Sequence, residues 1–295
     1  MSVAIFRDYD KAALDRQYDN GLKVGPEWLK AQRARWVEQS AQARDTLSCK
    51  LDVPYDDASG KRLDIFRPRQ SGGLAPVQIY IHGGYWISND KKDCSYVALG
   101  FTGAGFVNVV INYTLIPGAR MHEQVRQCRA AVGWVAAHIR DYGGDPERIY
   151  VTGHSAGGHL SVSLLTDPDA APGRIKGVTS LSGLYDLEPV RLSFVNETLG
   201  LTERDVTELS PVLVKPRDPS PRLLLTIGAN EGEEYIRQMN DLATAWRPSM
   251  PQLVARVLPD TDHFSMRAPL DDPNSGICQL IWKTMGAGNA ASAKA

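Results

Sequence analysis

The residues best suited to do chemistry lie in the segment 151–158, Val-Thr-Gly-His-Ser-Ala-Gly-Gly. The pattern Gly-x-Ser-x-Gly is met there by Gly153, Ser155 and Gly157. This pattern is typical of a nucleophile elbow, in which a serine stands on a strained turn between a strand and a helix. Glycines are needed on both sides because a Cβ would collide with the neighbouring backbone. The pattern therefore predicts a nucleophilic serine at position 155.

The flanking sequence decides between a functional turn and a serine in an ordinary strand-to-helix loop. A β-branched and aromatic run, Arg148–Thr152, follows the turn signal Gly-Gly-Asp-Pro at 143–146. After the serine, residues 159–165 contain no helix breaker. Strand, turn and helix thus come in the order that the elbow requires, and this favours the functional interpretation.

A serine hydroxyl is a weak nucleophile unless a base accepts its proton, so Ser155 needs a histidine. Among the six histidines, His263 lies in a polar loop directly after the last expected strand. In doubly wound sheets, functional groups gather at the carboxyl ends of strands, so His263 is the predicted base. The other histidines are assigned to helices, to the elbow itself or to a strand end: His82, His122, His138, His154 and His159.

The base must be oriented by an acid, and in this architecture the chain order is serine, acid, histidine. Glu231 stands a few residues past the expected strand Leu223–Ile227, where its carboxylate is able to reach an imidazole. Asp186, after the preceding strand, is the main competitor, and Asn230 is an uncharged neighbour. Glu231 is therefore the predicted acid, with Asp186 as the alternative.

Backbone donors are expected in the segment 82–86, His-Gly-Gly-Tyr-Trp, which follows a strand as the HGGG-type loop of esterases does. The N–H groups of Gly83 or Gly84, with that of Ala156, are predicted to form the oxyanion hole. Alternatively, the two glycines serve only a tight turn. The elbow about 70 residues later in the chain argues against this alternative, because esterases carry both motifs.

Three side chains are candidates for contact with the substrate. Tyr85 and Trp86 follow the oxyanion glycines and either wall a narrow acyl pocket or pack in the core beneath the loop. His159 lies one helical turn after Ser155, where its side chain either lines the pocket or supports the residues that line it.

Strands that alternate with helices predict an α/β fold with a mostly parallel central sheet covered by helices on both faces. From about Tyr9 to Arg44, two short amphipathic helices broken around Gly21–Pro26 are expected, as an arm packed on the domain or over its mouth. One domain is expected over residues 1–285, with a flexible tail at 286–295. The expected strands are Leu51–Tyr55 and Leu63–Phe66 (an antiparallel hairpin), Val77–His82, Val107–Asn112, Ile149–Thr152, Val178–Leu181, Leu223–Ile227 and Leu253–Leu258, and helices are expected at Val125–Ile139 and Tyr235–Trp246.

Composition excludes several function classes. The chain has 295 residues, 43% of them hydrophobic, and 33 basic residues balance 34 acidic ones, so no electrostatic footprint for nucleic acid or an anionic membrane is present. No apolar run reaches about 18 residues, and a cytoplasmic protein is expected. The four cysteines form no CxxC pair, and no histidine spacing suits a metal. Neither a dinucleotide fingerprint nor a Walker sequence is present, so no cofactor is expected.

With these residues in hand, the chain resembles the α/β-hydrolase superfamily and, within it, the arylformamidase (kynurenine formamidase)-like esterase group, whose relatives include carboxylesterases. The resemblance covers most of residues 9–265. It rests on segments 82–86 and 153–160, on Tyr9-Asp10 through Tyr18, and on segments 181–187, 209–211, 234–238 and 262–264.

This resemblance implies hydrolysis of a small acyl group, such as formyl, from an aromatic amide or ester through an acyl-enzyme. It also implies a departure, because Glu231 stands where the group usually carries an aspartate. A homodimer is compatible with the resemblance alone. The alternatives are a broad short-chain carboxylesterase and a ligand-binding protein that kept the fold but lost turnover.

Overall fold

A mixed sheet of eight strands forms the centre of the described part of the chain, in the order β1-β2-β4-β3-β5-β6-β7-β8. The computed structural model describes residues 3–69, 72–166 and 173–286. β1 and β2 form the expected antiparallel hairpin, β2 runs antiparallel to β4, and all later pairs are parallel. The strands are β1 (Ser48–Asp56), β2 (Lys61–Arg67), β3 (Ala75–Ile81), β4 (Val107–Ile111), β5 (Gly144–His154), β6 (Ile175–Leu181), β7 (Arg222–Gly228) and β8 (Leu253–Leu258).

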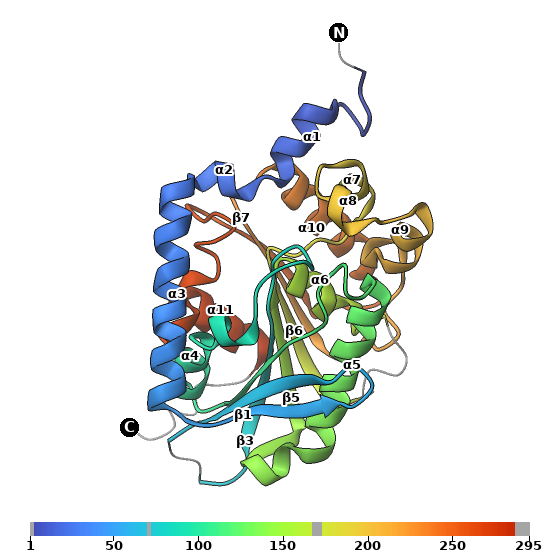
Figure 1. The fold of residues 1–295 in the computed structure, drawn as a ribbon. Helices are drawn as coiled ribbons and strands as arrows, with labels where there is room; N and C mark the ends of the chain where they lie inside the picture. The colour runs from blue at the N-terminus through green and yellow to red at the C-terminus, as the bar shows by residue number, and fades with distance from the viewer. Residues whose placement is uncertain (1–2, 70–71, 167–172, 287–295) are drawn as a thin grey trace.

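The central strands are buried on both faces, which explains their continuous apolar sequences. In β3, Val77, Ile79 and Ile81 point to one hydrophobic cluster and Tyr80 points to the other. One face carries α5 (Met121–His138), α6 (Ala156–Ser163) and α10 (Glu233–Trp246), and the opposite face carries α4 (Val97–Gly103) and α11 (Gly276–Met285) (Figure 1). The predicted fold class is therefore confirmed.

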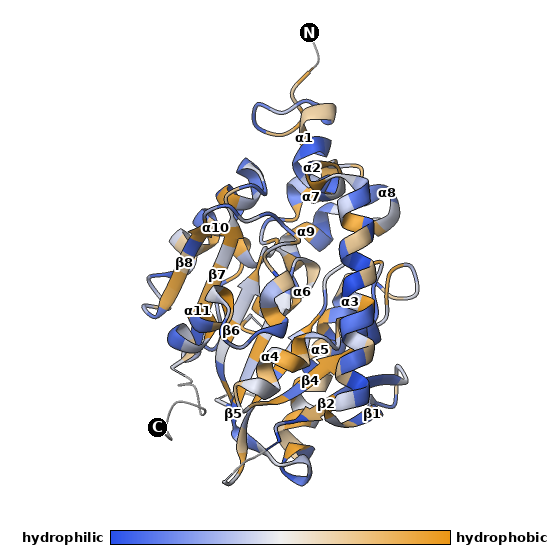
Figure 2. Ribbon diagram, turned by 90° about the vertical axis from the view of Figure 1, so that its left-hand side faces the viewer, coloured by the Kyte–Doolittle hydropathy of each residue, from blue (hydrophilic) through white to orange (hydrophobic). Residues whose placement is uncertain are grey.

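Three N-terminal helices replace the two that were expected: α1 (Lys11–Tyr18), α2 (Asn20–Val24) and α3 (Pro26–Thr46). The chain turns within the expected break Gly21–Pro26, at Gly25, which has a φ of +85° and precedes Pro26 at the start of α3. It differs from the expectation in that α2 runs through Gly21 and a further turn lies at Asp19, whose side chain caps α2. α3 is largely polar along its outer side, while α1 and α2 lie above the carboxyl ends of the strands (Figures 1 and 2).

Several elements differ from the expectations. β5 begins at Gly144, so only Gly143, with a φ of +82°, makes the turn that was assigned to 143–146. The short helices α7 (Glu188–Leu192), α8 (Asn196–Leu199) and α9 (Glu203–Leu209) lie between β6 and β7. These three helices, together with α4 and α11, were not predicted. The expected tail lies outside the described residues from 287 onward.

Candidate active site

The elbow at Ser155 is built by the close packing of β5, β3 and α6. Ser155 has φ 57° and ψ −121°, a conformation that non-glycine residues rarely adopt. A Cβ on Gly153 would overlap the carbonyl oxygen of Gly157, and a Cβ on Gly157 would overlap that of Ile81. The turn is therefore possible only with glycine at both positions, as the sequence pattern requires.

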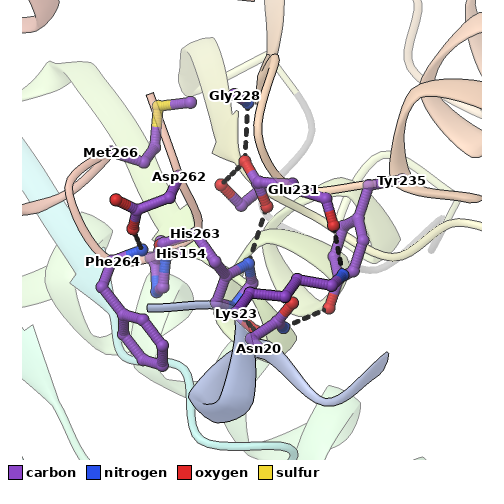
Figure 3. Close-up of polar contacts among 12 residues, drawn as sticks. Asn20, Lys23, His154, Gly228, Glu231, Tyr235, Asp262, His263, Phe264 and Met266 are labelled. Atoms are coloured by element: carbon purple, nitrogen blue, oxygen red, sulfur yellow. Dashed lines mark hydrogen bonds and ion pairs between the residues drawn. The ribbon is translucent and has the colours of Figure 1, made fainter. Parts of the chain in front are cut away.

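Ser155, His263 and Glu231 form a hydrogen-bonded chain. The hydroxyl of Ser155 lies 3.0 Å from Nε2 of His263. Nδ1 of His263 lies 2.7 Å from Oε2 of Glu231, the contact drawn in Figure 3. With Nδ1–H donating to the carboxylate, Nε2 is left to accept the serine proton. The exposed fractions of these residues are 3%, 5% and 0% in the same order, so little solvent competes for the bonds.

The carboxylate of Glu231 is fixed by two further donors. Its Oε1 accepts hydrogen bonds of 2.6 Å from the hydroxyl of Ser182 and of 2.6 Å from the backbone N–H of Gly228. Gly228 at the end of β7 packs so closely on Thr261 that a Cβ would overlap its carbonyl group. This close approach brings the loop of the acid against the loop of the histidine.

The two alternatives for the acid lie elsewhere. Asp186 forms a 2.9 Å ion pair with Arg237 of α10, and Asn230 is exposed. Neither side chain has a hydrogen bond to His263 in the described part of the chain. The geometry therefore groups Glu231, and not Asp186, with Ser155.

His154 supports the histidine loop from behind. Its Nε2–H donates a 2.7 Å hydrogen bond to the backbone oxygen of His263. Burial, and then the nearby charges of His263 and Arg267, hold the pKa of His154 well below its usual value. The ring stays neutral and keeps the donor that fixes the loop.

The segment 82–86 lies directly against the elbow. A Cβ on Gly83 would come within 2.9 Å of the Cβ of Ser155, and Gly84 has a φ of +115°. Within the described residues, the backbone N–H groups of Gly83 and Gly84 donate no hydrogen bond to another protein group. Ala156 begins α6, where the first N–H groups of a helix have no intrahelical acceptor. The two loops thus offer free donors beside the serine.

A cavity of about 180 Å³ opens onto Ser155 and His263. Loops at the carboxyl ends of the strands supply one side and the N-terminal arm supplies the other. Its lining includes Tyr18, Asn20, Leu29, Arg33, Gly84, Tyr85, Phe194, Phe264 and Arg267.

Tyr85 reaches this cavity, but Trp86 and His159 do not. Trp86 and His159 are fully buried and contact each other, with Nε1–H of Trp86 donating to Nδ1 of His159 at 3.3 Å. His159 donates in turn to the backbone oxygen of Leu209 at 2.8 Å, and burial lowers its pKa to about 4. These two side chains belong to the core beneath the loop, which corrects their expected place at the substrate.

The arm contributes contacts that the sequence interpretation missed. The hydroxyl of Tyr85 donates to the backbone oxygen of Tyr18 at 2.6 Å, and Asn20 donates to the hydroxyl of Tyr235 at 2.7 Å. Lys23 donates to the backbone oxygen of Glu231 (Figure 3). The aromatic and charged residues of the arm were visible in the sequence, but no local pattern links residues about 210 positions apart.

The described residues contain no group of three His, Cys, Asp or Glu side chains able to hold a metal ion. Nor does any helix in those ranges have the length and apolarity needed to cross a membrane.

Comparison with known proteins extends these observations. A family model described as BD-FAE matches residues 63–187. The chain is 32% identical over 279 residues to a Danio rerio protein named kynurenine formamidase, covering 92% of this chain and 89% of that protein. A Salmo salar protein of the same name is 28% identical and covers 95% of this chain and 98% of its own. A solved structure of a candidate thioesterase from Silicibacter has a TM-score of 0.79, with 28% identity and coverage of 91% and 98%.

The mixed sheet, the elbow and the solved neighbours define this chain as an α/β-hydrolase. It is a hydrolase of the group that holds arylformamidases and carboxylesterases. By its identity and coverage with the Danio rerio relative, the chain belongs to the kynurenine formamidase family.

Proposed function

We propose that this hydrolase removes the formyl group from N-formylkynurenine or a closely similar aromatic formamide, with Ser155 as nucleophile. The observation that carries the proposal is the hydrogen-bonded chain from Ser155 through His263 to Glu231 at the mouth of a small cavity. The choice of substrate is supported by the name of the two fish relatives, which match over nearly their whole length.

The proposed reaction has two halves. His263 takes the hydroxyl proton while Ser155 attacks the formyl carbon, and the resulting oxyanion is held by the N–H groups of Gly83, Gly84 and Ala156. His263 then gives its proton to the leaving arylamine, and a formyl-enzyme remains. In the second half, His263 activates water, which attacks this ester and releases formate.

The buried carboxylate of Glu231 gives the histidine its role in both halves. It fixes the tautomer with Nδ1–H and stabilises the imidazolium that forms when the serine proton is taken. An amide leaving group needs protonation more than an ester does, because an amine anion is a far poorer leaving group. The hydrogen bond at Nδ1 therefore matters most for formamide substrates.

The test compares N-formylkynurenine with p-nitrophenyl acetate on the wild type and on Ser155→Ala. We expect formamide turnover to dominate, the variant to lose at least about 10³-fold in kcat, and a fluorophosphonate to label only the wild type. Turnover of the formamide by Ser155→Ala at the wild-type rate would contradict the proposed nucleophile.

A short-chain carboxylesterase is the second candidate. It is favoured by a Mycobacterium tuberculosis relative named a probable carboxylic ester hydrolase, 31% identical over 72% of this chain and 55% of that protein. The ratio of kcat/KM for the formamide and the aryl acetate separates the two candidates. Ligand binding without any labelling of Ser155 would instead indicate a protein that has lost turnover.

A further inference from the structure

A buried cation lies in the wall of the catalytic cavity. Arg267 is 7% exposed and lines the same cavity as Ser155 and His263. Its guanidinium packs 3.8 Å from the centre of the Trp36 ring, and Nη1 lies 3.9 Å from the sulfur of Cys94. Within the described residues no carboxylate forms an ion pair with it, and its Nε has no hydrogen-bond partner.

This arrangement is unusual for a guanidinium, which stays charged at every accessible pH and carries five donors. Buried charges in proteins are normally paired, because desolvation of an unpaired ion is strongly unfavourable. The contact with Trp36 stabilises a cation but satisfies none of its donors. Nη1 has the weak sulfur acceptor of Cys94 and the guanidinium lies near the hydroxyl of Tyr80, but among the described residues Nε has no hydrogen-bond partner. The guanidinium therefore keeps donors for an acceptor that enters the cavity.

The position of Arg267 in the chain indicates which part of a substrate would accept hydrogen bonds from its guanidinium. Arg267 follows His263 by one turn of the same loop, in which the N–H of Met266 donates to the backbone oxygen of Asp262 at 3.0 Å. The glycine loop of the oxyanion site approaches the serine from β3, a separate element. His263 delivers its proton to the leaving group and lines the same cavity as Arg267, so we infer that the guanidinium faces the leaving-group side.

We propose that Arg267 binds a carboxylate on the leaving arylamine or alcohol, and that it makes the enzyme selective for substrates that carry this carboxylate. A planar carboxylate matches the fork of a guanidinium with two parallel hydrogen bonds. A second cation, Arg33 of α3, lines the cavity from an exposed position, where it attracts the same anion at longer range. The inference rests on the proposed function only where it takes a formamide as the substrate. The binding of a carboxylate on the leaving group by Arg267 does not depend on that choice.

The experiment measures selectivity between matched substrates. N-formylkynurenine carries a carboxylate and an ammonium group, and N-formylkynuramine keeps the reacting amide, the aryl ketone and the ammonium group but lacks the carboxylate. In Arg267→Met, which still packs on Trp36, we expect the ratio of the two kcat/KM values to fall by about 10- to 100-fold, the usual effect of losing a hydrogen bond to a charged group. Arg267→Lys keeps the charge and retains part of the ratio. An unchanged ratio in Arg267→Met overturns the proposal and leaves Arg267 a packing residue.

Arg33→Met is the matched control for long-range attraction. Its effect on the ratio is expected to be smaller and to disappear at high salt, because exposed charges are screened, whereas the effect of Arg267→Met persists. If high salt abolishes both effects equally, the guanidinium of Arg267 makes no direct contact and the proposal fails.

Two further measurements keep this test separate from that of the proposed function. The ester 3-acetoxybenzoate and its methyl ester form a second anionic and neutral pair, so selectivity is measured even if no formamide is cleaved. Calorimetry with 2-aminobenzoate and 2-aminobenzamide needs no turnover. We expect the wild type to bind the anion about tenfold more tightly than the amide and Arg267→Met to lose this preference. Equal binding of the two by the wild type overturns the proposal.

Discussion

Glu231→Gln tests the proposed acid more sharply than a deletion, because the structure dictates which way the new amide must point. The Oε1 position accepts one hydrogen bond from the backbone N–H of Gly228, which is unable to rotate, and one from Ser182. An NH₂ group there would face a fixed donor at 2.6 Å. The carbonyl oxygen of the glutamine therefore takes the Oε1 position, and the NH₂ group faces His263.

The consequence is the wrong tautomer of the histidine. With an N–H donor opposite Nδ1, the imidazole carries its proton on Nε2, which then faces Ser155 as a donor and is unable to accept the hydroxyl proton. The comparable amide substitution in a serine protease lowers kcat by about 10⁴-fold without changing the geometry. A similar loss here corresponds to about 5 kcal/mol of transition-state stabilisation.

The assay is kcat for N-formylkynurenine and p-nitrophenyl acetate, with thermal unfolding measured in parallel. We expect the loss of kcat in both reactions and little change in melting temperature, since the variant keeps the size and the hydrogen bonds at Oε1. Ser182→Ala is the matched control, because it removes one neutral hydrogen bond to the same carboxylate. A Glu231→Gln variant that keeps more than about a tenth of the wild-type kcat would refute the reasoning.

Three other predictions follow from the geometry. In Gly157→Ala, the new Cβ overlaps backbone of β3, so the free energy of unfolding in urea should fall by about 3 kcal/mol or more; an unchanged value would mean that the elbow relaxes. Lys23→Met removes the donor to the backbone oxygen of the proposed acid, and we expect kcat to fall severalfold, while Lys30→Met on the exposed surface of α3 leaves it unchanged. The pKa of His159, lowered to about 4 by burial, lies below its unfolded value near 6.5, so the unfolded chain binds more protons between these pH values. As the pH drops from 6.5 to 4, this residue should therefore lower the free energy of unfolding by up to about 1.4 kcal/mol per pH unit. Urea unfolding at a series of pH values checks this, because in His159→Gln the free energy of unfolding should depend less steeply on pH.

The sequence alone determined the parts of this protein that depend on local patterns. The strand Leu253–Leu258 was predicted with the bounds that the structure has, because an apolar and β-branched run between two prolines is typical of a strand, even though this edge strand buries only Leu253. The elbow was predictable because its strained turn demands glycine at two nearby positions. Periodicity also contained a signal that was not used: Ile277, Ile281 and Met285 recur at the helical spacing of α11.

Tertiary structure alone decided the environment of these residues. Tyr85 and Trp86 are neighbours in the sequence, yet one lines the cavity and the other is buried against His159. Only the fold brings the N-terminal arm onto the proposed acid and leaves Arg267 without a carboxylate partner among the residues that the structure describes. Burial and charge pairing depend on contacts between residues far apart in the chain, so local composition carries little information about them. The sequence thus determined the reactive groups, and the packing of distant segments decided what surrounds them.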